Sequence, residues 1–191
     1  MIGSLLTHIE KFIAIQPDRA DLISSYFEPR RYQKKELLLK EGEHCFEKFF
    51  IVKGCVQLTF LKQNGSEQTL DFAIKNWWVS DFSAFPVGGT AQFSIRAVED
   101  TEVLSISADR QRLLLREIPE LESYFHAVFQ RAYAASQMRI RYLYEFSKED
   151  LYQHFRRDFP AFTQRVPQYL LASFLGFTPE YLSELRKRFI S

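Results

Sequence analysis

The spacing of apolar residues divides the chain into helical and strand-like regions. Residues 5–13 carry apolar side chains at helical spacing, and a second helix is predicted from Asp18 through Ser25, between Pro17 and Pro29. From residue 30 to about 107 the pattern changes to short apolar runs that are separated by polar turns. These strand-like runs lie at 37–39, 49–52, 56–60, 67–74, 77–79, 92–98 and 101–107. Asn64-Gly65 is typical of a hairpin turn. This pattern predicts an all-β sandwich or barrel for the middle of the chain.

One long helix is predicted over residues 119–146. Pro119 suits a first helical turn, and apolar side chains recur every three or four residues after it. A helix of this length extends beyond a small barrel, so part of its apolar stripe needs another partner. We expect that partner to be a second copy of the chain, while packing on its own domain stays the alternative. The expected dimer-interface residues are Leu121, Phe125, Val128, Ala132, Ala135 and Tyr142.

Residues 168–187, QYLLASFLGFTPEYLSELRK, satisfy the demands of a helix-turn-helix. Ala172 is the small residue that a crossing helix needs, and Gly176 follows four residues later, where the chain must turn with positive φ. Thr178 is placed to cap the second helix, with Pro179 at its first position and Glu180 near its positive end. Leu171, Leu175, Phe177, Leu182 and Leu185 form the apolar inner face. A further helix is expected from Ser147 to about Arg157, ended by Pro160.

This motif predicts binding to double-stranded DNA, because the second helix of such a motif enters the major groove. The early residues of that helix are expected near base edges and the basic residues at its far end near phosphates. Glutamate can accept a hydrogen bond from a cytosine amino group. The expected DNA-binding residues are Thr178, Pro179, Glu180, Ser183, Glu184, Arg186, Lys187 and Arg188. The alternative is a sensor or scaffold whose helical end contacts a protein partner.

Charge is unevenly distributed along the chain. The 191 residues include 25 Lys/Arg and 24 Asp/Glu, a net charge of +1. Residues 131–191 hold ten Lys/Arg and six Asp/Glu, a net of +4, which permits nucleic-acid binding there without requiring it. No apolar run reaches the roughly 18 residues of a membrane span, and the start of the chain lacks the basic region of a signal peptide. We therefore expect a cytoplasmic protein.

Candidate catalytic and metal-binding groups are few. Cys45, Cys55 and His44 lack the spacing of a metal site, so no metal and no cofactor are expected. The other histidines are scattered at positions 8, 126 and 154. The sequence shows no pairing of a nucleophile with a base and no phosphate loop. These observations argue against an enzyme.

The order of barrel, long helix and helix-turn-helix resembles the Crp/Fnr superfamily of bacterial regulators over nearly the whole chain. EGEHCFEKFFIVKGCVQLTF resembles the first barrel motif of that superfamily, in which Gly42 and Gly54 mark turns, and RVPQYLLASFLGFTPEYLSELRKR resembles its DNA-binding motif. The resemblance implies an α+β chain with a cyclic-nucleotide-binding-like jelly roll, homodimeric DNA binding, and a switch operated by a ligand or redox signal. The implied domains are 1–118 (sensor), 119–146 (dimerisation helix) and 147–191 (helix-turn-helix).

The sequence departs from the family pattern in the region that would bind an effector. In cyclic-nucleotide binders, a glutamate holds a ribose hydroxyl and an arginine neutralises the phosphate. Here Asp81 could replace the glutamate, but Ala91 falls where the arginine is expected, so cyclic AMP is not the expected effector. Another small ligand, or none, stays open. The candidate pocket residues are Ser80, Asp81, Phe82, Ser83, Ala91, Gln92 and Phe93.

Two further departures concern other known properties of the family. An iron–sulfur sensor would need four cysteines, and the chain has two. At the DNA-binding end, Glu184 stands where many members have an arginine that reads guanine, and no β-wing is expected after the recognition helix. These features leave the affinity and sequence preference for DNA open.

Overall fold

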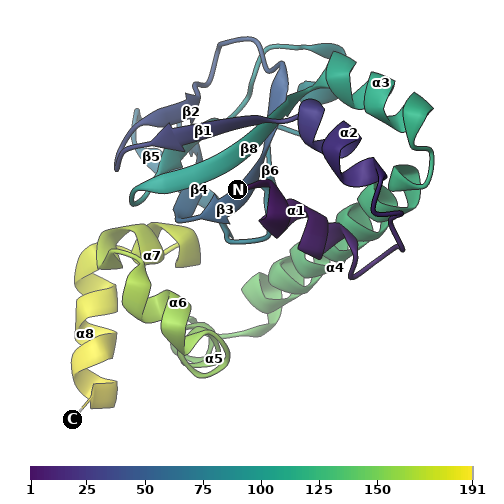
Figure 1. The fold of residues 1–191 in the computed structure, drawn as a ribbon. Helices are drawn as coiled ribbons and strands as arrows, with labels where there is room; N and C mark the ends of the chain where they lie inside the picture. The colour runs from purple at the N-terminus through teal and green to yellow at the C-terminus, as the bar shows by residue number, and fades with distance from the viewer. Residues whose placement is uncertain (191) are drawn as a thin grey trace. The chain divides into compact units, whose positions relative to one another are not determined.

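The computed structural model describes residues 1–190, which form two compact units, one of residues 1–129 and one that begins at Gln130. The long helix α4 (Leu121–Glu145) continues from the first unit into the second (Figure 1). The helix predicted over 119–146 is therefore present. The domain limits predicted at 118 and 146 treat this helix as a separate part and stay a prediction.

The first unit contains eight antiparallel strands in two four-stranded sheets. One sheet has the order β1-β8-β3-β6, with β1 at Glu28–Tyr32, β8 at Thr101–Ser107, β3 at Glu47–Lys53 and β6 at Trp78–Val79. The other has the order β2-β7-β4-β5, with β2 at Leu37–Leu39, β7 at Ser94–Ala97, β4 at Cys55–Leu61 and β5 at Glu67–Ile74. The predicted α+β class and antiparallel β-region are confirmed, with the refinement that two sheets pack together and do not close into one barrel.

Two elements of this unit were not predicted from the sequence. Strand β1 contains Pro29, which reads as a helix terminator, but an edge strand tolerates proline because one of its sides needs no backbone donor. Helix α3 (Ala108–Glu117) follows β8 directly and begins with Ser107, whose hydroxyl accepts a hydrogen bond from the Arg110 amide at 3.3 Å. Helix α2 (Arg19–Ser25) lies within its predicted limits, whereas α1 (Ile2–Ile9) begins three residues before and ends four residues before the predicted range of 5–13.

Two apolar cores fill the first unit because alternate residues of a strand face opposite sides of its sheet. Phe49 and Ile51 of β3 point into the core between the two sheets. Phe50, between them, points outward into a second core, which is formed by the outer face of the β1-β8-β3-β6 sheet and the helices that cover it. Leu5, Ile9, Ile23, Leu114, Leu121, Tyr124 and Phe125 contribute helical side chains to this second core. Strand β3 is thus buried on both faces.

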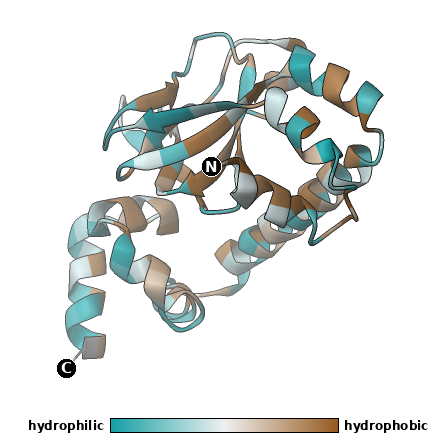
Figure 2. Cartoon of the chain, viewed as in Figure 1, coloured by the Kyte–Doolittle hydropathy of each residue, from teal (hydrophilic) through white to brown (hydrophobic). Residues whose placement is uncertain are grey.

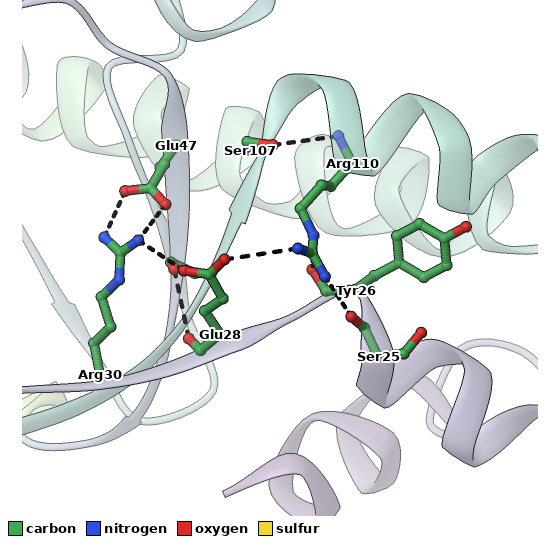
Figure 3. Close-up of polar contacts among 8 residues, drawn as sticks. Ser25, Tyr26, Glu28, Arg30, Glu47, Ser107 and Arg110 are labelled. Atoms are coloured by element: carbon green, nitrogen blue, oxygen red, sulfur yellow. Dashed lines mark hydrogen bonds and ion pairs between the residues drawn. The ribbon is translucent and has the colours of Figure 1, made fainter.

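An ionic network fastens the edge strand β1 to its neighbours (Figure 3). The guanidinium of Arg30 makes two hydrogen bonds, of 2.6 and 2.7 Å, to the carboxylate of Glu47 on β3, and a third of 3.0 Å to Glu28. From α3, Arg110 reaches the other oxygen of Glu28 at 3.6 Å and donates to the Tyr26 carbonyl at 3.0 Å. These groups are partly exposed, so their main effect is to fix geometry.

The most unusual side chain of the fold is Lys48 on β3, which is 1% exposed and has no hydrogen-bond partner for Nζ among the described residues. Its Nζ lies 3.5 Å from the ring centre of Phe125 and 4.5 Å from that of Trp78, with Phe85 and Phe129 further out. Aromatic faces attract a cation but replace its hydration only in part. Burial therefore holds the pKa of Lys48 well below its ordinary value.

The second unit consists of the end of α4 followed by α5 (Lys148–Asp158), α6 (Pro160–Arg165), α7 (Gln168–Leu175) and α8 (Pro179–Ile190). Helix α5 begins at the predicted Ser147, whose hydroxyl accepts from the Asp150 amide at 3.2 Å. Pro160 ends the preceding helix, as predicted, and also starts α6, because proline suits a first helical turn.

We predict that Lys48→Met raises the free energy of unfolding by about 1–3 kcal/mol at pH 7, because an apolar chain of similar length replaces a buried amine without partners. The pKa of Lys48 is lower in the folded chain than in the unfolded chain. Between these two pKa values, the unfolded chain therefore binds more protons than the folded chain. The stability of the wild type should therefore rise as the pH increases from 7 toward 10, and the Met variant should lack this rise.

Urea unfolding at several pH values, followed by tryptophan fluorescence, measures both effects, since both tryptophans lie in the first unit. Lys53→Met is the control, because Lys53 lies on the same strand and is exposed. Parallel stability curves for the wild type and Lys48→Met would contradict the prediction.

Candidate nucleic-acid interface and effector region

Helices α7 and α8 form the predicted helix-turn-helix. Helix α7 ends at Gly176, which has a φ of +76°, the left-handed conformation that favours glycine. The amide of Phe177 then donates to the Ala172 carbonyl at 2.8 Å, and this bond closes the turn. After the turn, the Thr178 hydroxyl accepts from the Tyr181 amide at 3.2 Å and caps α8, which begins at Pro179.

Packing between the two helices depends on a small residue at their crossing. Ala172 is fully buried, and Leu171, Leu175, Leu182 and Leu185 are 0–4% exposed around it. A larger side chain at 172 would push the helices apart, since interiors are close-packed. Figure 2 shows α7 hydrophobic over most of its length and α8 alternating between hydrophilic and hydrophobic residues, as expected for a buried first helix and an amphipathic second one.

The exposed face of α8 carries Glu180, Ser183, Glu184 and Lys187. These residues follow one another at intervals of three, one and three, so they lie on the same side of the helix. Thr178 and Pro179 are exposed at its start. The structure therefore brings most of the predicted DNA-binding residues onto one solvent-facing surface.

Two of the predicted phosphate contacts differ from Lys187 in their surroundings. Arg186 is half-buried and falls on the side of α8 that also carries Leu182, away from Glu184. Arg188 follows Glu184 by four residues and is exposed, but its guanidinium lies 2.8 Å from the carboxylate of Glu149 on α5. Lys187 is therefore the basic residue that lies between Ser183 and Glu184 on the exposed face.

Two arginines that sequence reasoning missed support the helix-turn-helix from other helices. Arg139 of α4 donates to the Phe174 carbonyl near the end of α7 at 2.9 Å, and its guanidinium lies 4.0 Å from the centre of the Phe174 ring. Arg156 of α5 donates to the Phe189 carbonyl at 2.8 Å, near the end of α8. Cations at helix C-termini satisfy carbonyls that have no partner within the helix. The apolar stripe around Arg139 gives no signal for such a contact.

In the first unit, Asp81 organises the loop that corresponds to the predicted effector region. Its buried carboxylate accepts hydrogen bonds from the amide and hydroxyl of Ser83, at 3.0 and 2.6 Å, from the Ala84 amide at 3.2 Å and from the Gln92 amide at 2.7 Å. Burial acts to raise the pKa of Asp81, but these hydrogen bonds outweigh it, and the pKa lies below its ordinary value. Both carboxylate oxygens are thus engaged within the loop.

The remaining residues predicted for an effector pocket are spread over several contacts. Ala91 is 2% exposed, and its amide and carbonyl are bonded to the backbone of Glu43 and Gly42. Ser80 donates to the Glu47 carbonyl at 2.8 Å. The Phe82 ring contacts Phe129, whereas Phe93 contacts Phe60 on another strand. The structure brings Asp81, Ser83 and Gln92 together, and it directs the two phenylalanines to different neighbours.

The residues predicted for the dimer interface divide into three groups along α4. Leu121 and Phe125 are buried in the helical core of the first unit, and Val128 packs partly against it. Ala132 and Ala135 are exposed. Tyr142 stacks on Phe146 with a ring distance of 5.1 Å and contacts His154 at 4.4 Å. The large apolar side chains that α4 exposes are Phe129, Tyr133, Met138, Ile140, Leu143 and Tyr144.

Other chemistry is sparse in the described part of the chain. Cys45 and Cys55 are both buried, and neither forms a disulfide within residues 1–190. Within residues 1–190, no three side chains of histidine, cysteine, aspartate or glutamate lie close enough together to hold a metal ion. The described helices include none with the length and apolar character of a membrane span.

Comparison with known proteins agrees with this architecture. Residues 29–117 match the cyclic nucleotide-binding domain family. The cyclic AMP receptor protein of Thermus thermophilus is 28% identical over 119 residues, which are 62% of this chain and 52% of that protein. The anaerobic regulatory protein of Bacillus subtilis is 28% identical over 107 residues, covering 52% of this chain and 45% of that protein. The chain thus spans about half the length of the curated relatives it matches.

Solved structures share the fold over most of the chain. The c-di-GMP responsive global regulator CLP of Xanthomonas campestris has a TM-score of 0.73 at 16% identity and covers 91% of each chain. The Thermus thermophilus catabolite activator protein has a TM-score of 0.59 at 20% identity and covers 95% of this chain and 85% of that one. Residues 29–117 of the first unit are therefore similar to a cyclic nucleotide-binding domain, and the fold is that of these solved structures. Over part of its length the chain is thus similar to proteins that are named as regulators, among them the cAMP-activated global transcriptional regulator CRP of Salmonella typhimurium, at 26% identity over 91 residues.

We predict that Asp81→Asn destabilises the first unit by about 1–3 kcal/mol at pH 7, because the amide cannot accept all the hydrogen bonds that the carboxylate accepts. A lowered pKa gives stability above the unfolded value near 3.8 that is lost as the pH falls through the folded pKa. The difference between wild type and variant should therefore shrink below pH 4. Denaturant unfolding at pH 7 and pH 3.5 measures it.

Asp71→Asn, on the exposed side of β5, is the control for a general loss of negative charge. Cyclic AMP should shift the unfolding midpoint of neither the wild type nor Asp81→Asn. A midpoint that rises with cyclic AMP in the wild type alone, with equal stability of the two proteins in its absence, would instead make Asp81 a ligand contact.

Proposed function

We propose that this chain is a homodimeric transcription regulator of the Crp/Fnr type that binds double-stranded DNA through α8. The observation that carries the proposal is the exposed polar face of α8, held on a buried helix-turn-helix core by the Gly176 turn. Residues 131–191 have ten basic and six acidic side chains, so the region around this helix has a net charge of +4. This charge favours approach to a phosphate backbone. The cytoplasm, where such a regulator works, stays our predicted location.

The glutamates on the same face favour one alternative. Glu180 and Glu184 outnumber Lys187 there, and phosphates repel them. A cyclic-nucleotide-binding-like sensor or scaffold whose helical end contacts a basic protein partner would use this face equally well. In the DNA-binding proposal, the two glutamates read cytosine amino groups and lower the affinity for sequences without them.

The second copy is proposed to pack along α4. Phe129, Ala132, Ile140 and Leu143 are exposed on this helix and recur near one side of it. A 25-residue helix is about 37 Å long, enough for a two-fold seam of several turns. Leu121 and Phe125 are already buried in the core of their own unit. The proposed interface therefore retains Ala132 from the predicted residues, and its large apolar contacts lie further along α4, near Ile140.

Cyclic AMP is not the proposed effector. Ala91 supplies no cation for a phosphate, and the carboxylate of Asp81 is already engaged within its loop. The nearby Arg96, which could have served instead, pairs with Glu67 at 3.1 Å. Another small ligand, or no ligand, fits the contacts of this region better.

We predict that Glu184→Arg strengthens DNA binding and changes the preferred sequence. The substitution removes a charge that phosphates repel and adds a side chain that reads guanine, and each base contact is worth about 1–3 kcal/mol of discrimination. Selection from a random DNA pool, followed by anisotropy titrations at two salt concentrations, measures sequence preference and affinity. For both proteins, binding should weaken steeply as salt rises.

The exposed Glu122 on the first turn of α4 provides the matched control, because Glu122→Arg makes the same change of charge in the first unit. If Glu122→Arg and Glu184→Arg raised the DNA affinity equally, the effect would be one of net charge alone. If the wild type and Glu184→Arg selected identical motifs, position 184 would not face the bases. No DNA binding by the wild type at low salt would favour the protein-partner alternative.

We predict a dimer at micromolar concentration that Ile140→Glu converts to a monomer. The variant would bring two like charges together across the two-fold axis of an apolar seam. Sedimentation velocity measures the mass of each species. Ala134→Glu is the control, since Ala134 is exposed on the same helix but lies off the proposed seam. A monomeric wild type, or equal dimers for the wild type and Ile140→Glu, would rule out this seam.

A further inference from the structure

A hollow of about 400 Å³ lies between α1 and the turn that joins β5 to β6, on a part of the first unit that the proposed function does not use. One side of α1 and the residue two positions after its end supply Gly3, Ser4, Thr7, His8 and Lys11, and the turn supplies Lys75 and Asn76. The turn is held in place by backbone bonds from Asn76 to Ile51, at 2.8 Å, and from Trp77 to Ile74, at 3.0 Å. The turn is therefore the fixed wall of the hollow.

The lining contains two lysines and no carboxylate, and its other polar side chains are hydroxyl, amide and imidazole groups that can donate as well as accept hydrogen bonds. Lys11 and Lys75 are exposed, and neither makes an ion pair within residues 1–190, while the lining includes no carboxylate. The Ser4 hydroxyl donates to the side-chain oxygen of Asn76 at 3.4 Å, which leaves the amide nitrogen of Asn76 as the group that can still donate. A wall of ammonium, amide and hydroxyl groups is complementary to an oxyanion.

A chain of hydrogen bonds connects this hollow to the start of α4. Nδ1 of His8 lies 2.9 Å from the Tyr124 hydroxyl, and Nε1 of Trp78 lies 2.8 Å from the same hydroxyl. The indole nitrogen can only donate, so the Tyr124 oxygen accepts from Trp78. The buried Tyr124 hydroxyl then donates its own proton to Nδ1 of His8. His8 therefore lines the hollow and also bonds to Tyr124, which belongs to the core beneath α4.

We propose that this hollow binds a phosphate group, either inorganic phosphate or that of a small phosphorylated metabolite, and that His8 and Tyr124 transmit its binding to the first turn of α4. Lys11 and Lys75 neutralise the charge of the phosphate, and Thr7 and Asn76 donate to its oxygens. The bound anion draws α1 toward the β5–β6 turn, and this movement changes the hydrogen bond between His8 and Tyr124. The site is separate from the loop around Asp81.

The experiment uses the full chain with Trp77→Phe, which leaves Trp78 as the single tryptophan, since the chain has two. Inorganic phosphate is titrated at constant ionic strength against chloride while Trp78 emission and the thermal midpoint are recorded. A sugar phosphate and its unphosphorylated sugar form parallel arms. We expect saturable changes with phosphate, and tighter binding of the sugar phosphate if a metabolite is the natural ligand.

Lys11→Gln combined with Lys75→Gln should weaken phosphate binding about tenfold or more, because two charge-assisted contacts are lost. Lys40→Gln combined with Lys62→Gln makes the same change at exposed lysines outside the hollow and should leave binding unaltered. Equal responses from the two double variants, or an equal response to chloride, would overturn the site.

Tyr124→Phe tests the connection to α4 separately from binding. The variant removes the hydroxyl that Trp78 and His8 share, so phosphate should still raise the thermal midpoint while Trp78 emission no longer responds. An emission change that persists in Tyr124→Phe would overturn the proposed transmission. Both results are independent of DNA binding, so failure of the DNA-binding proposal would not decide them.

Discussion

The first unit depends on one aromatic cluster, in which Trp78, Tyr124 and Phe125 meet on the outer face of the β1-β8-β3-β6 sheet. The Phe125 ring lies 5.5 Å from that of Trp78 and 5.0 Å from that of Tyr124, and the three side chains belong to one core of strand and helix residues. Because Tyr124 is fully buried, its hydroxyl needs partners, and it finds them in Trp78 and His8. This single cluster therefore positions α1 and the first turns of α4 on the sheet, and it encloses the amine of Lys48.

Much of the fold could be predicted from the sequence because the responsible signals are local. The alternation around Leu58, the Asn64-Gly65 turn and the periodic stripe after Pro119 each depend on neighbouring residues. The elements that were missed depend on distant partners. Strand β1 is stabilised by pairing with β8 and by the contact of Arg30 with Glu47. Neither interaction can be predicted from the five residues of the strand itself. Helix α3 follows β8 without a loop, so no glycine or proline separates the two elements.

The candidate sites show the same division. The helix-turn-helix could be predicted because Ala172, Gly176 and Thr178 each meet a requirement of backbone geometry or close packing within twenty residues. In contrast, the sequence suggested a carboxylate at Asp81 for a ligand, whereas the folded loop uses it for its own amides. A residue type and a position in a motif do not determine whether a group is free, because that depends on which backbone donors fold back toward it. The hollow beside α1 joins segments some seventy residues apart and has no sequence signal at all.

The contact of Arg139 with Phe174 has a mechanical consequence for the second unit. The guanidinium comes from α4, and the carbonyl and ring that it contacts belong to α7, the first helix of the helix-turn-helix. Neighbouring residues of a helix point about 100° apart, so a modest rotation of α4 about its axis would swing Arg139 away from both groups. The hydrogen bond and the ring contact of Arg139 therefore couple the rotation of α4 about its axis to the position of α7, because a rotation that moves Arg139 breaks both contacts.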